Sequence, residues 1–85
     1  HWKVDLQKGV YRLKFKFLKP LMGGGEMFLE LGQQILKKHN SMTESDLLVW
    51  EDVSLPQGSF DFTPFYRKGR RSNYFPLWVE IERVE

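Results

Sequence analysis

The sequence contains no cysteine, which excludes disulfide bridges and metal sites built from thiolates. Histidine is nearly as scarce, because His1 and His39 are the only two and stand far apart in the chain. The sequence also lacks any apolar run near the ~20 residues that a membrane-spanning helix needs. We therefore expect no metal, no cofactor and no membrane among the partners of this chain.

A strong net charge is absent as well. The 13 basic and 11 acidic residues leave a formal charge of +2, which is too small to predict nucleic-acid binding. No Ser–His–Asp arrangement stands out, and the glycines at 23–25 lack the Lys-Ser/Thr that follows a phosphate-binding loop. A domain of 85 residues also has little room for a deep catalytic cleft. We therefore predict a binding or accessory module and not an enzyme.

Aromatic side chains, by contrast, are abundant. Seven Phe, three Trp and three Tyr supply the large side chains that a small domain needs for a dense core. Apolar residues recur at every second position, which is the pattern of strands with one buried face. The pattern is clearest over 11–17, where Tyr, Leu and Phe alternate with Arg and Lys. A turn at Gly9 separates this strand from the strand over 2–6, so we predict that the two form a hairpin.

The remaining strands are short and separated by turn residues. Pro64 indicates that the strand beginning at 59 ends there or lies at a sheet edge. A second hairpin is expected at 29–36, and further strands are expected at 47–55, 59–65 and 77–82. Long loops are expected at 19–26, 38–46 and 66–76. The count of about seven strands predicts an all-β, antiparallel β-sandwich, jelly-roll-like, over residues 1–85 as one domain. Because the chain opens at His1 directly in a strand pattern, we expect a fragment or the C-terminal part of a longer protein.

Four segments, taken in order, carry a resemblance. The opening of the chain has the pattern W-x-V…G-x-Y, formed by Trp2, Val4, Gly9 and Tyr11. An apolar hairpin follows at 29–36, a W-x-x-V-x-L-x-x-G segment at 50–58 and a closing strand at 77–84. In this order the segments resemble the jelly-roll (galactose-binding-like) carbohydrate-binding modules. The resemblance implies a non-catalytic accessory domain of a secreted sulfatase or glycoside hydrolase, with an extracellular or periplasmic location. It implies a glycan, sulfated or neutral, and an adjacent catalytic domain of the same protein as partners.

The basic and aromatic stretch at 66–75 is the candidate ligand-binding segment. Arginine forks match sulfate or phosphate oxygens in pairs, and aromatic faces stack on sugar rings or bases. The alternative is a solvated loop, or one that contacts acids of a neighbouring domain. The candidate ligand-binding residues are Tyr66, Arg67, Lys68, Arg70, Arg71, Tyr74 and Trp78. They could bind a sulfated glycan or another anionic polymer.

Two further features of the sequence leave alternatives open. The basic residues at 12, 14 and 16 form either a basic surface or a charge ladder against Glu80 and Glu82. Trp78 stands on the polar face of its strand, where it is either exposed or covered by a loop. Trp2 is expected in the core, and His39 is expected to be exposed. An exposed Trp78 or a sheet edge could also serve a protein–protein interaction.

Overall fold

The computed structural model describes residues 2–40, 45–69 and 72–85, and of residue 72 only the backbone. The described chain contains β-strands and no helix. The eight strands are β1 (Trp2–Leu6), β2 (Gly9–Leu21), β3 (Glu26–Leu31), β4 (Gln34–His39), β5 (Ser45–Leu55), β6 (Gly58–Lys68), β7 (Ser72–Tyr74) and β8 (Trp78–Arg83). The predicted all-β class is confirmed, with eight strands where the sequence indicated about seven.

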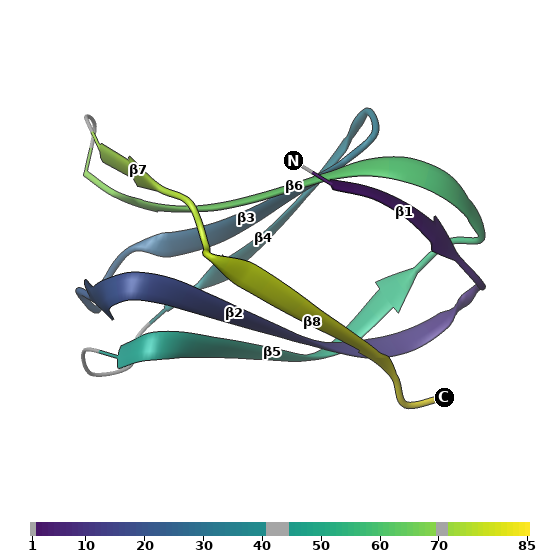
Figure 1. Cartoon of the computed structure of the whole chain (residues 1–85), viewed down its shortest axis with the longest axis horizontal. Helices are drawn as coiled ribbons and strands as arrows, with labels where there is room; N and C mark the ends of the chain where they lie inside the picture. Colours follow the sequence, from purple (N-terminus) through teal and green to yellow (C-terminus); the bar gives the residue numbers. More distant parts are fainter. Residues whose placement is uncertain (1, 41–44, 70–71) are drawn as a thin grey trace.

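The strands form two antiparallel sheets that pack face to face (Figure 1). The first sheet has the order β1-β6-β3-β4, and β7 pairs with the far part of β6. The second sheet has the order β5-β2-β8. This arrangement confirms the predicted sandwich of two layers. None of the described residues belongs to a helix of the length and apolarity that a membrane crossing requires.

The core lies between the sheets and follows the period-two pattern of the sequence. From Tyr11 to Phe17 in β2, and along β3, every second side chain is buried, because successive side chains of a strand point to opposite faces. No polar or charged side chain of the described residues is buried. The fully buried large side chains, with less than 2% of their surface exposed, are Leu13, Phe15, Met27, Leu29, Leu31, Phe62, Pro64 and Tyr66.

The predicted hairpin between the first two strands is wrong. β1 pairs with β6, where Trp2 lies opposite Phe62, whereas β2 pairs with β5 and β8 in the other sheet. The connection between β1 and β2 therefore carries the chain from one layer to the other. Alternation identifies the buried face of each strand, but it does not identify the neighbouring strand, so both arrangements bury the same residues. The second predicted hairpin is confirmed, because β3 pairs with β4.

Two expected loops, 19–26 and 66–76, are partly strand. β2 continues through Pro20 to Leu21, and β6 continues past Pro64 to Lys68 before β7 folds back on it. Pro64 therefore does not end its strand. Its position explains why, since β1 pairs with 58–62 and β7 with 66–68, so that at Pro64 only β3 lies alongside. Proline has no backbone N–H and cannot donate a hydrogen bond to a neighbouring strand. It is tolerated where no strand lies alongside to accept that bond.

The predicted charge ladder is present on the outer face of the β5-β2-β8 sheet. Arg12 contacts Glu82 at 3.2 Å and Glu51 at 2.9 Å, and Lys14 lies opposite Glu80 in the register. The hydrogen bond to Glu51, together with the charges of Glu51 and Glu82, raises the pKa of Arg12. A β-bulge brings Glu51 into reach, because β5 has one extra residue here and Asp52 adopts a φ of 58°.

Trp2 departs from its predicted place. It is 40% exposed and not part of the core, because it is the first residue of β1, an edge strand. Trp50 packs against the core while remaining partly exposed. His39 is exposed, as predicted, at the end of the edge strand β4.

Candidate functional site

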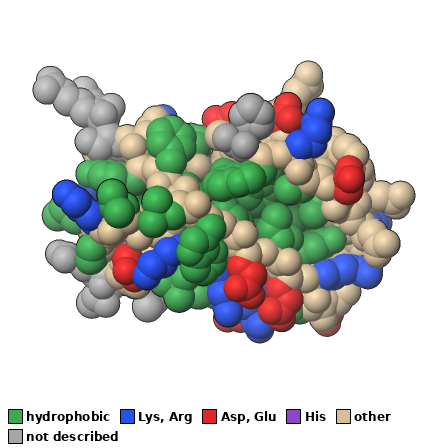
Figure 2. Space-filling view, in the orientation of Figure 1, with side chains coloured by type: hydrophobic (Ala, Val, Ile, Leu, Met, Phe, Trp, Pro, Cys, Tyr) green, Lys and Arg blue, Asp and Glu red, His purple; other side chains and the backbone are tan. Residues whose placement is uncertain are grey.

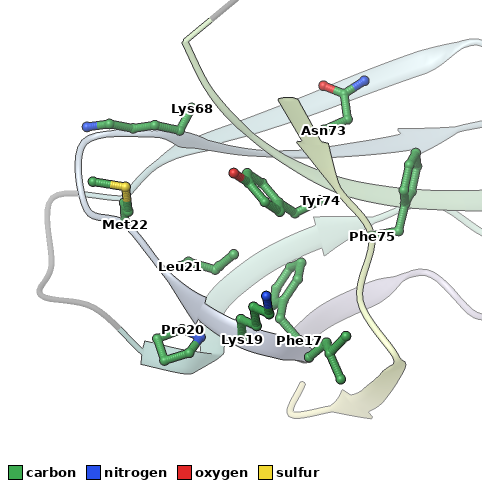
Figure 3. Close-up of a pocket in the computed structure, with 10 residues that line it drawn as sticks. Phe17, Lys19, Pro20, Leu21, Met22, Lys68, Asn73, Tyr74 and Phe75 are labelled. Atoms are coloured by element: carbon green, nitrogen blue, oxygen red, sulfur yellow. The ribbon is translucent and has the colours of Figure 1, made fainter. Parts of the chain in front are cut away.

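An open cleft of about 520 Å³ lies at one end of the sandwich, between the end of β2 and the segment that contains β7 (Figure 3). This volume falls within the range of small-ligand sites, which is roughly 300–1,000 Å³. The residues that line the cleft are Phe17, Leu18, Lys19, Pro20, Leu21, Met22, Lys68, Asn73, Tyr74 and Phe75.

The last residues of β2 form one wall of the cleft. Phe17 and Leu21 are buried and belong to the core, whereas Leu18 is 75% exposed. The strand loses its regular pairing here, because the register with β5 shifts between Lys16 and Leu21. Apolar side chains consequently reach solvent on this wall instead of alternating with charged ones.

The opposite wall consists of β7 and the residue that follows it. Figure 3 shows Tyr74 extending into the space between Lys68 and Leu21, with Phe75 farther along the same segment. Both rings are available to a ligand, since Tyr74 and Phe75 have about half or more of their surface exposed. β7 reaches this place because it pairs with the end of β6, Tyr74 lying opposite Tyr66.

Tyr66 is a structural residue and does not line the cleft. Its side chain is completely buried, and its hydroxyl donates a hydrogen bond to the carbonyl oxygen of Met22. The same hydroxyl accepts hydrogen bonds from the amide of Gly25 at 3.0 Å and from Nδ2 of Asn40 at 3.1 Å. Tyr66 thus fixes the β2–β3 turn against β6, and its side chain, which was predicted to contact a ligand, has no exposed surface with which to do so.

Arg67 is also engaged within the domain. Its guanidinium lies 5.4 Å from the ring centres of both Phe28 and Phe65, and those two rings stack at 5.0 Å. Its Nε donates a hydrogen bond to Oδ1 of Asn73 at 2.9 Å. Arg67 therefore lies on the outer face of β6 and is absent from the lining of the cleft.

We expect Arg67→Ala to lower the free energy of unfolding by about 1 kcal/mol, which is the scale of an exposed cation–π contact. The loss follows from removing the guanidinium from Phe28 and Phe65. Urea denaturation measures it, and Arg67→Lys should restore part of it because the charge over the rings is retained. An unchanged midpoint for Arg67→Ala would show that the contact does not stabilise the fold.

The charges at the cleft are of one sign. Lys19 and Lys68 line it, and no carboxylate is among the described residues that do so. Lys68 also donates a hydrogen bond from Nζ to the carbonyl oxygen of Gly23 at 2.6 Å, which holds its ammonium beside the turn after β2. The cleft consequently combines an apolar floor, two exposed aromatic rings and two cations.

Of the five predicted ligand-binding residues that the structure describes, two line the cleft, Lys68 and Tyr74. Trp78 is 45% exposed, so it is not covered by a loop, but it lies opposite Lys16 and outside the cleft lining. Arg70 and Arg71 lie outside the described residues. The sequence prediction missed Lys19, whereas Phe75 lies in the predicted segment 66–75 but was not among the candidate residues. The apolar–polar alternation of β2 ends after Phe17, in the sequence Leu-Lys-Pro-Leu-Met, and this was the signal in the sequence for the wall that β2 forms.

No cluster of metal-binding side chains is found among the described residues. Among the residues that the structure describes, His, Asp and Glu do not gather in groups of three or more that could hold a metal ion.

Comparison of the chain with protein-family models, curated proteins and solved structures finds no match.

Proposed function

We propose that this chain is a non-catalytic carbohydrate-binding module whose end cleft binds an anionic sugar. The observation that carries the proposal is the presence of Tyr74 and Phe75 beside Lys19 and Lys68 in one cleft, with no carboxylate among its described lining residues. An anionic polysaccharide offers both matching features, because its rings have apolar faces and its sulfate or carboxylate groups are negative.

Each side chain has a distinct part in this proposal. The exposed ring of Tyr74 stacks on a sugar face, which lets an aromatic body make apolar contact while its hydroxyl stays solvated. The ammonium groups of Lys19 and Lys68 pair with sulfate or carboxylate oxygens through charge-assisted hydrogen bonds. A sulfated glycan is therefore favoured over a neutral one, and the cations act as point charges without the paired geometry of arginine.

Affinity for a heparin-derived oligosaccharide, set against an uncharged oligosaccharide of equal length, tests the proposal. We expect Tyr74→Ala and Lys19→Ala each to weaken heparin binding about tenfold, corresponding to roughly 1.4 kcal/mol. Lys19→Ala should also flatten the dependence of affinity on salt, because one ion pair fewer is formed.

Matched controls lie on the edge strand β4, away from the cleft. Lys38→Ala removes the same charge, and Ile35→Ala removes an apolar side chain that is 63% exposed, so neither should change the affinity. Equal losses of affinity for Lys19→Ala and Lys38→Ala would show that binding depends only on net charge, which would contradict a site in the cleft. Equal binding of the neutral and sulfated oligosaccharides would overturn the assignment of an anionic ligand.

The setting that we propose is an accessory domain of a secreted sulfatase or glycosidase, extracellular or periplasmic. Its support is the order of strand motifs at 2–13, 29–36, 50–58 and 77–84. The reading frame that encodes this chain tests the setting. A carbohydrate-active catalytic domain in the same frame is the expected result, and a frame that joins it to a cytosolic enzyme would contradict the proposal.

A further inference from the structure

The two sheets are open on the same side of the sandwich. β1 is the edge strand of one sheet and β8 of the other, and both lie at the front in Figure 1. Within the described chain no strand pairs with the free edge of β8, whose other edge is joined to β2. A free edge presents a row of backbone N–H and C=O groups that can pair with a further strand.

Apolar side chains gather in the opening between β1 and β8 (Figure 2). Three inward-facing residues of the two edges are only half-buried, namely Val4 of β1 and Val79 and Ile81 of β8, although all three pack against the core. On one flank Arg83 limits the opening, since its guanidinium donates hydrogen bonds to the Lys8 carbonyl oxygen and to Oε1 of Gln7. The part of the β8 edge that remains exposed is the length of one short strand.

From Val79 to Ile81 the β8 edge has no inward-pointing charge, no proline and no bulge. Edge strands are often protected by inward-pointing charges, by proline or by bulges. β4 has such a charge, because Lys38 lies opposite the buried Met27 on the core side, and β5 has the bulge at Asp52. β8 has neither a proline nor a bulge, and its one inward-facing charge, Arg83 opposite the buried Tyr11, lies at the end of the strand, so residues 79 and 81 present valine and isoleucine to the core.

The bound edge of β8 shows which kind of strand fits the free one. β2 places Leu13 and Phe15 opposite Ile81 and Val79, and it places basic residues opposite the carboxylates of β8. A strand on the free edge would meet these same side chains, since side chains of one strand are shared by both neighbours. Its complement is therefore a strand of alternating apolar and basic residues.

A second copy of the chain does not fit through β8 itself. An antiparallel pairing of two β8 strands centred on Glu80 or on Ile81 sets a carboxylate of residue 80 against residue 80 or 82 of the other copy. Like charges directly opposite each other destabilise a strand pair. In these two registers the charge pattern disfavours a second copy and favours a basic partner.

We infer that the free edge of β8 is a docking site for an extended segment of a partner protein, in which apolar residues alternate with lysine or arginine. The segment adds a fourth strand to the β5-β2-β8 sheet, covers Val79 and Ile81, and sets its cations beside Glu80 and Glu82. This interaction uses a different surface from the sugar cleft, because no residue of β8 lines that cleft.

A peptide with the sequence of residues 11–17, Tyr-Arg-Leu-Lys-Phe-Lys-Phe, is a suitable probe because it has the required pattern. We expect the isotope-labelled chain to bind it, with amide chemical-shift changes and slowed hydrogen exchange in β8. A peptide with glutamate at the three basic positions should bind about tenfold more weakly or not at all. Replacement of β2 by the peptide, seen as loss of the β2–β5 pairing, would overturn the inference.

Charge reversal in the chain supplies the second arm. Glu80→Lys should weaken binding of the basic peptide and strengthen binding of the acidic one, whereas Glu30→Lys, on the other sheet, should leave both unchanged. Tyr74→Ala should also leave peptide binding unchanged, which separates this site from the cleft. Self-association of the unmodified chain through β8, or equal binding of the two peptides, would contradict the proposed partner.

Discussion

Tyr66→Phe is expected to lower the free energy of unfolding by about 2–3 kcal/mol, although it removes a single oxygen atom. The hydroxyl is a donor to Met22 and an acceptor for Gly25 and Asn40, so its loss takes a partner from each of them. The amide of Gly25 is buried and loses this partner, which costs about 1–3 kcal/mol, and the part-buried hydrogen bonds to Met22 and Asn40 add to the loss. For a domain of this size the melting temperature should fall by roughly 10–20 °C.

The matched control is Tyr74→Phe, which removes the same atom from a ring that is 48% exposed. Its stability should equal that of the parent chain. A melting temperature for Tyr66→Phe within a few degrees of the parent would show that the hydroxyl does not hold the β2–β3 turn. Because the cleft wall at Met22 depends on that turn, we also expect weaker binding by Tyr66→Phe with an unchanged salt dependence.

Gly25→Ala is expected to cost about 3 kcal/mol or more, because the added methyl group has no space. A Cβ at this position would lie 2.6 Å from the carbonyl oxygen of Arg67 and 2.6 Å from the hydroxyl and ring of Tyr66. One of these neighbours is backbone, so relief requires that β3 and β6 separate locally. Denaturant unfolding measures the loss.

Gly69→Ala separates this steric effect from the conformational one. Gly69 has a φ of 77°, but nothing lies within 4 Å of an added Cβ, so the cost is the left-handed backbone alone, about 1 kcal/mol. Gly25→Ala should therefore be clearly the more destabilising of the two. The reverse order would mean that the close approach of the β2–β3 turn to Tyr66 is not a feature of the folded chain.

The layers of this fold could be predicted from the sequence because burial follows alternation. Leu13, Phe15 and Phe17 occupy every second position and all three are buried in the structure. Strand partnership could not be predicted in the same way. The turn after Leu6 suits a hairpin as well as a crossing between layers, and only the packing of the whole chain selects the crossing.

The candidate site was predictable only in part, for a related reason. Composition marks 66–75 as basic and aromatic, but it does not show that Tyr66 is buried and Arg67 stacked on the outer face, while Lys68 and Tyr74 reach the cleft. Lys19 and Phe75 join them through pairing between distant segments. Their proximity follows from β2 and β7 meeting at one end of the sandwich, which no local pattern encodes.

The most direct test of the proposed binding site is an amide chemical-shift titration of the isotope-labelled chain with a heparin-derived tetrasaccharide. We expect the largest shifts at 17–22, 68 and 73–75, from both walls of the cleft, with little change along β4. Largest shifts along β4, or the absence of shifts in the cleft at saturating sugar, would contradict the account.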